Sequence, residues 1–68
     1  MNFPNIEQIA ICLEQDEQGK PAYFAHVFLD DNRIIVLDPC RTLEDAEEEG
    51  RKYAEMIAGI KAKLENET

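Results

Sequence analysis

The stretch TLEDAEEEGRKYAEM, residues 42–56, decides the fold, because its apolar and small residues recur every three or four positions. The same spacing continues toward the C-terminus, and the full stripe comprises Leu43, Ala46, Gly50, Tyr53, Ile57, Ile60 and Leu64. Such a stripe is typical of a helix that buries one face. Thr42 is a good N-cap residue, and Asp45 stands where a capping box places its acid. We therefore predict one long helix over about residues 43–64.

Three strands are predicted before this helix. Residues 6–14 alternate between apolar and polar side chains, which is the pattern of a half-buried strand. Residues 22–29 and 33–38 are apolar on both faces, and polar turns around Gly19 and Asn32 connect the three segments. The sequence thus predicts an α+β domain spanning residues 1–68, a three-stranded antiparallel meander (β-β-β-α) with one long C-terminal helix packed on one face. The predicted core is Ile9, Ile11, Leu13, Leu43, Tyr53 and Ile57.

A glycine in the middle of the predicted helix has two interpretations. Gly50 lies on the apolar stripe, so the helix backbone can come close to the sheet at this point. An interior glycine costs about 1 kcal/mol relative to alanine, which is consistent with a packing reason. The alternative is that glycine is merely tolerated there.

The composition limits the classes of partner. The chain has 68 residues and a formal net charge of −8, from fifteen acids and seven bases. This charge disfavours direct binding to nucleic acid or to anionic membranes. It favours basic partners, or it serves only solubility. The start, MNFPNIEQ, has neither the basic nor the apolar region of a signal peptide, and no apolar run approaches the ~20 residues of a membrane span. We expect a cytoplasmic protein with reduced cysteines.

Catalytic chemistry is not indicated. His26 is the only histidine and lies within an apolar strand, where a half-buried, satisfied side chain is favoured over a catalytic base. Cys12 and Cys40 match no metal-binding or redox spacing, and the glycines form no phosphate loop. We expect no enzymatic activity, no catalytic residues, no metal and no cofactor.

Five of the six residues from Glu44 to Glu49 are acidic. The simplest explanation is a solvated helix start, because acids interact favourably with the positive end of the helix dipole. Two pairs with a spacing of four residues, Glu47–Arg51 and Glu48–Lys52, are expected to add stability.

The meander topology brings a second group of acids to the same end of the domain. In an antiparallel meander, the first hairpin and the start of the helix lie at one end of the sheet. We name the combined group the acidic pole, and its candidate partner-binding residues are Glu14, Asp16, Glu17, Glu44, Asp45, Glu47, Glu48 and Glu49. To a basic groove, such a cluster resembles a row of phosphates. The expected partner is a basic nucleic-acid-binding protein or complex.

One helix can cover only one face of this sheet. Residues 34–37 form an unbroken apolar run, so the strand that contains them has apolar side chains on both faces. Monomers seldom leave a large apolar patch in water. We expect a homodimer through the open sheet face or a docked partner to cover it.

This chain resembles two protein families. The segment TLEDA, opening a helix after a three-stranded meander over roughly residues 9–57, resembles HicB-like antitoxins, which neutralise a small RNA-cleaving toxin. The small size and acidity of the whole chain resemble anti-CRISPR proteins, which are phage-encoded inhibitors. Both resemblances imply a non-enzymatic protein that occludes a basic nucleic-acid-binding surface. The anti-CRISPR-like function is the leading prediction, with the antitoxin and a small homodimeric structural protein as alternatives.

Overall fold

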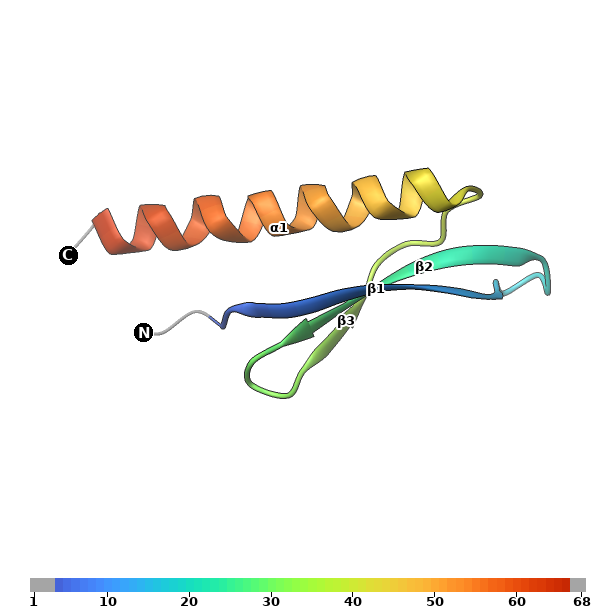
Figure 1. Ribbon diagram of the computed structural model, residues 1–68, viewed down its shortest axis with the longest axis horizontal. Coiled ribbons are helices and arrows are strands. Elements are labelled where there is room, and N and C mark those ends of the chain that lie inside the picture. Colours follow the sequence, from blue (N-terminus) through green and yellow to red (C-terminus); the bar gives the residue numbers. More distant parts are fainter. Residues whose placement is uncertain (1–3, 67–68) are drawn as a thin grey trace.

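A computed structural model describes residues 4–66 and has the predicted order of elements. The strands are β1 (Ile6–Gln15), β2 (Pro21–Leu29) and β3 (Ile34–Val36), and they are followed by the helix α1 (Leu43–Asn66). The strands form one antiparallel sheet in the order β1-β2-β3, and α1 lies along one face of it (Figure 1). The predicted α+β meander is therefore confirmed, with β3 shorter than expected.

The register of the sheet defines its two faces. Ile9 is paired with Val27, and Ile11 with Ala25, so these odd-numbered residues share the face that α1 covers. Even-numbered residues, such as Phe24 and Phe28, point to the opposite face. Among the described residues, α1 contacts β1 and β2 but not β3. The buried core consists of Ala22, Ala25, Val27, Leu29, Ala46 and Ile57.

Close contact between helix and sheet explains the mid-helix glycine. A Cβ atom on Gly50 would lie 3.0 Å from Cγ2 of Ile9 and 3.8 Å from Cβ of Ala25. Ala46, one turn earlier, is completely buried. Gly59, by contrast, has open space around it. The structure thus supports close approach rather than chance at Gly50.

The predicted core was wrong at two positions. Leu13 is 63% exposed and Leu43 is 47% exposed. Leu13 lies near the end of β1, where the hairpin extends past the start of α1 (Figure 1). Leu43 is the first residue of the helix, one turn before the first buried residue, Ala46. Of the other predicted core residues, Ile57 is buried, while Ile9, Ile11 and Tyr53 are half-buried.

Local hydrogen bonds fix both ends of the connection between sheet and helix. The N–H of Asp45 donates to Oγ1 of Thr42 at 3.1 Å, so the predicted N-cap is confirmed. At the other end of this connection, the N–H of Leu37 donates to the carbonyl of Ala25 at 3.0 Å. This bond continues the pairing one residue beyond β3. The chain between these points, residues 38–42, carries Arg41 to the end of the sheet where α1 begins.

Candidate functional site

The acidic pole is assembled from two segments that are distant in sequence. Backbone hydrogen bonds of 2.8 and 2.9 Å join Tyr23 and Cys40, and Nη1 of Arg41 lies 3.2 Å from Oδ2 of Asp16. These contacts hold the residues just before α1 against the β1–β2 hairpin. As a result, the hairpin and the start of α1 lie at one end of the molecule (Figure 1).

One predicted member of the pole points elsewhere. Glu14 has the same parity as Ala10 and Cys12, so its side chain lies on the face of the sheet that α1 does not cover. There its Oε2 atom is 3.0 Å from Nε2 of His26. His26 is half-buried and has a polar partner, as expected for a structural histidine.

Asp16 stabilises the hairpin rather than presenting its carboxylate to a partner. Its Oδ1 accepts the N–H groups of Gln18 and Lys20, both at 2.9 Å, and its side chain is only 10% exposed. The Lys20 N–H is the largest cause of a lowered pKa of the Asp16 carboxyl. The Gln18 N–H and Arg41 lower this pKa further, against desolvation, which raises it.

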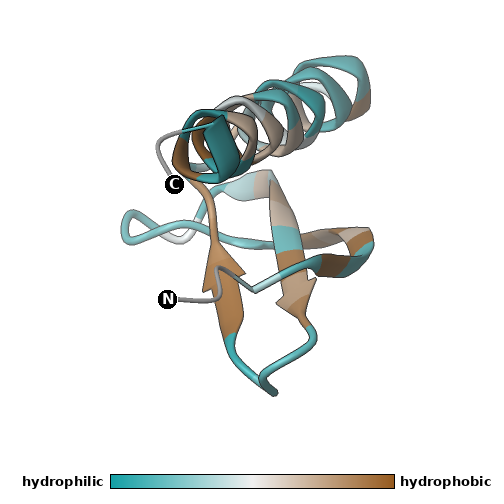
Figure 2. Cartoon of the chain, turned by 90° about the vertical axis from the view of Figure 1, so that its left-hand side faces the viewer, coloured by the Kyte–Doolittle hydropathy of each residue, from teal (hydrophilic) through white to brown (hydrophobic). Residues whose placement is uncertain are grey.

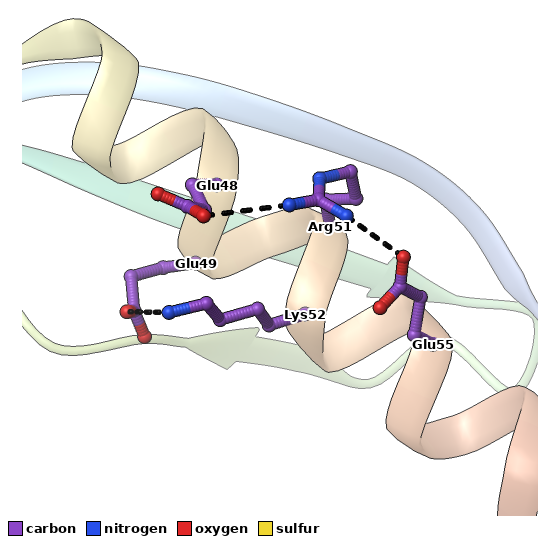
Figure 3. A network of polar contacts seen from close by, with 5 residues as sticks. All are labelled: Glu48, Glu49, Arg51, Lys52 and Glu55. Carbon is purple, nitrogen blue, oxygen red and sulfur yellow. Dashed lines mark hydrogen bonds and ion pairs between the residues drawn. The ribbon is translucent and has the colours of Figure 1, made fainter.

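Figure 3 shows a network of ion pairs on the surface of α1, made by Glu48, Glu49, Arg51, Lys52 and Glu55. Arg51 lies 3.4 Å from Glu48 and 2.8 Å from Glu55. Lys52 is 4.0 Å from Glu49. The predicted pairs Glu47–Arg51 and Glu48–Lys52 are therefore wrong, because Lys52 pairs with the acid three residues earlier and Arg51 is shared between two other acids.

Four predicted members of the pole remain exposed without an ion pair in the described part of the chain. They are Glu17, Glu44, Asp45 and Glu47. Glu17 comes from the hairpin and the other three from the first two turns of α1. These four carboxylates are the part of the acidic pole that can meet a partner.

Carboxylates in and near the pole affect the pKa of the Cys40 thiol. Burial is the largest cause of a raised pKa of this thiol, followed by the charges of Glu49, Asp45 and Asp38. Asp38 was missed by the sequence analysis because it lay in a predicted strand. The structure instead places it in the loop that leads to α1, where it adds a carboxylate beside the pole. Cys40 itself pairs with Tyr23 on the face that α1 covers.

A shallow hollow of about 290 Å³ adjoins the pole. Its lining residues are Asp16, Glu17, Gln18, Phe24, Pro39 and Arg41. The apolar part of this lining comes from Phe24 and Pro39, and Glu17 contributes an exposed carboxylate. The hollow can therefore accept the aliphatic part of a side chain whose charged end reaches Glu17.

The described residues show no metal site and no membrane-spanning helix. Within residues 4–66, no three His, Cys, Asp or Glu side chains are grouped to hold a metal ion. No helix in this range is both long enough and apolar enough to cross a bilayer. Both cysteines are free thiols.

Comparisons with models of protein families, with curated proteins and with solved structures find no match to this chain. The surface chemistry of the described residues is therefore what supports a function.

Proposed function

We propose that this protein is a non-enzymatic inhibitor that uses its acidic pole to occupy a basic nucleic-acid-binding surface of a partner, as a DNA-mimicking anti-CRISPR protein does. One observation carries the proposal. The exposed carboxylates Glu17, Glu44, Asp45 and Glu47, drawn from two separate segments, lie at one end of the fold without ion pairs in the described chain.

The density of carboxylates along the start of α1 is close to the density of phosphates in nucleic acid. Residues 44–49 extend about 9 Å along the helix axis, so their five acids provide roughly one charge per 1.8 Å, against about 1.7 Å for duplex DNA. Glu48 and Glu49 are partly neutralised by Arg51 and Lys52. The other three acids lie within residues 44–47, about 6 Å of helix, so their spacing is roughly 2 Å per charge, between the 1.7 Å of duplex DNA and the 3.4 Å of a single strand.

The helix dipole favours the first-turn acids Glu44 and Asp45, but stability does not favour gathering Glu17 and Glu47 beside them. Exposed carboxylates of like sign repel one another, and exposed ion pairs contribute only about 0–1 kcal/mol. Facing a positively charged groove, the same carboxylates would accelerate association and select the partner. A basic side chain of that groove would also fit the hollow beside Glu17, with its stem against Phe24 and Pro39.

Displacement of DNA tests the proposal. The protein is added to purified RNA-guided nuclease complexes, each bound to a fluorescent DNA duplex, and release of the duplex is measured. We expect the wild-type chain to release DNA from at least one complex of the panel. Release from none of them would contradict an anti-CRISPR-like function.

Two double variants show whether the pole is responsible. Glu17→Lys with Glu47→Lys reverses one unpaired acid from each segment, and inhibition should fall at least tenfold. Glu7→Lys with Glu55→Lys is the control, because both residues lie away from the pole. Each reversal adds two charges, so both double variants change the net charge from −8 to −4. Equal losses of inhibition would mean that net charge, and not the pole, matters.

The antitoxin is a second candidate, favoured by the order of three antiparallel strands and one helix that begins at a Thr42 cap. Its test is RNA cleavage by a small toxin encoded beside the gene. Neutralisation of that toxin, without any effect on RNA-guided nucleases, would favour the antitoxin.

A further inference from the structure

The outer edge of β3 has unused backbone hydrogen-bonding groups. The carbonyl of Arg33 accepts the N–H of Leu29, and the N–H of Leu37 donates to Ala25, so odd-numbered residues of this strand face β2. In an antiparallel ladder the intervening residues point the other way. The N–H and C=O groups of Ile34 and Val36 therefore face away from the sheet, and they make no hydrogen bond within residues 4–66.

The side chains of this strand are also uncovered. Ile34 is 56% exposed and Val36 is 53% exposed, and α1 does not contact β3. Figure 2 shows β3 as a uniformly hydrophobic (brown) arrow below the helix. An uncovered edge of branched apolar residues, with no charge among residues 34–36, is open to pairing with another strand, and its short length limits the area of contact.

The opposite edge of the sheet is protected. In β1 the register shifts between Ile6 and Gln8, and the strand carries the exposed acids Glu7 and Glu14. Bulges and charges on an edge strand discourage pairing with another chain. The contrast singles out β3 as the edge at which another strand can add.

We propose that β3 pairs with β3 of a second copy of this chain, antiparallel about a two-fold axis through Ile35, to form a six-stranded sheet. In this register Ile34 lies opposite Val36 of the second copy. Each donates its N–H to the carbonyl of the other, and the symmetric pair does the same. These four hydrogen bonds use the outward-facing groups of all four residues.

Local charges at the β3 edge allow a second copy as the occupant, although each chain carries a net charge of −8. The two-fold register places Asp38 opposite Asn32 of the second copy and Arg33 opposite Leu37, so no carboxylate lies opposite another. Because β3 runs toward the acidic pole, the antiparallel arrangement also places the two poles at opposite ends of the joined sheet (Figure 1). The poles are then separated by more than the ~8 Å Debye length of physiological salt, so their mutual repulsion is largely screened. The dimer would present two acidic poles.

The dimer should be weak. A stable interface buries about 800 Å² on each partner, roughly a sixth of the 5176 Å² accessible surface of this chain. A three-residue edge buries less than that, because β3 ends at Val36. We expect the mass to change from one chain to two between micromolar and millimolar concentrations.

Sedimentation equilibrium and amide hydrogen exchange of the wild-type chain test this interface. As the concentration rises into the dimer range, the amides of Ile34 and Val36 should become protected, because only pairing with a second copy gives them hydrogen-bond partners. A chain that stays monomeric at millimolar concentration would overturn the proposal. So would a dimer in which these two amides still exchange rapidly.

Two variants at one position separate edge pairing from packing of the open sheet faces. Val36→Pro removes an N–H that β2 does not use, and the proline ring blocks the edge, so the dimer should be lost. Val36→Thr keeps the N–H and the branched shape, so the dimer should remain. Loss of the dimer in Val36→Thr, with protection absent from the Ile34 amide, would assign the dimer to the open sheet face instead.

Discussion

Gly50 lies so close to Ile9 that a Cβ on the glycine would stand 3.0 Å from the Cγ2 atom of the isoleucine. This contact sets the distance between α1 and the sheet. It also explains why a residue with poor helix propensity occupies the middle of the longest element. Gly59 on the same helix has no neighbour within 4 Å of an added Cβ and serves as its matched control.

Replacing the two glycines by alanine should therefore give different results. Gly59→Ala should raise the free energy of unfolding by about 0.5–1 kcal/mol, because only helix propensity changes. Gly50→Ala gains the same propensity but forces Ile9 to shift, so its net gain should be smaller or negative. Urea unfolding measures both variants. Equal stabilisation by the two substitutions would show that the helix does not depend on close approach at Gly50.

Truncation of apolar residues should follow burial rather than sequence pattern. Ile57→Ala should lower the free energy of unfolding by about 2–5 kcal/mol, as expected for a buried isoleucine. Leu13→Ala should cost less than about 1 kcal/mol, because this side chain is mostly exposed. Thermal or urea unfolding of both variants gives the comparison. A larger loss at Leu13 would mean that another part of the chain, or a second copy, covers it.

The hairpin should weaken in acid through Asp16. The folded protein lowers the pKa of this carboxyl, so its stabilising effect is complete above the ordinary value of 3.8 and is lost as the pH falls through the lowered value. Asp16→Asn keeps an oxygen that can accept the Gln18 and Lys20 N–H groups but removes the charge facing Arg41. The stability difference between wild type and Asp16→Asn should shrink as the pH is lowered below 3.8. A difference that grows in acid would contradict the assigned hydrogen bonds.

Cys40 offers a chemical measurement of the negative potential near the pole. In a Cys12→Ser background, the pH dependence of alkylation by iodoacetamide reports the pKa of the Cys40 thiol. Glu49→Gln and Asp45→Asn should each lower this pKa and speed alkylation at neutral pH, because a nearby negative charge disfavours the thiolate. Glu55→Gln, further along the helix, should have little effect. Unchanged rates in all three variants would show that the charges of Glu49 and Asp45 do not raise this pKa.

The sequence predicted the elements well because their periods follow from backbone geometry. Alternation in residues 6–14 and the three-four spacing after Thr42 correspond directly to a strand and a helix. Burial at the ends of these elements did not follow from periodicity. Leu13 and Leu43 both occupy apolar positions in these patterns, yet both side chains are exposed. The hairpin and the helix overlap only in part, and the periodicity of a sequence does not predict how far two elements overlap.

The acidic pole was partly predictable. Strand parity already places Glu14 on the face of Ala10 and Cys12, so its separation from the helix acids could have been foreseen. Asp16 also carried a signal, since an aspartate shortly before Gly19 is typical of a turn stabilised by its own side chain. The ion-pair partners of Arg51 could not be predicted, because several acids lie within reach and the side-chain conformation decides among them.

Mapping of the partner contact by nuclear magnetic resonance tests the central claim most directly. The isotope-labelled chain is titrated with an unlabelled RNA-guided nuclease complex that it inhibits, and the amide signals are followed. The signals of Glu17, Glu44, Asp45 and Glu47 should shift or broaden first, and added salt should reverse the effect. Changes confined to the open sheet face around Phe28, Ile34 and Val36, and insensitive to salt, would contradict the acidic pole as the binding surface.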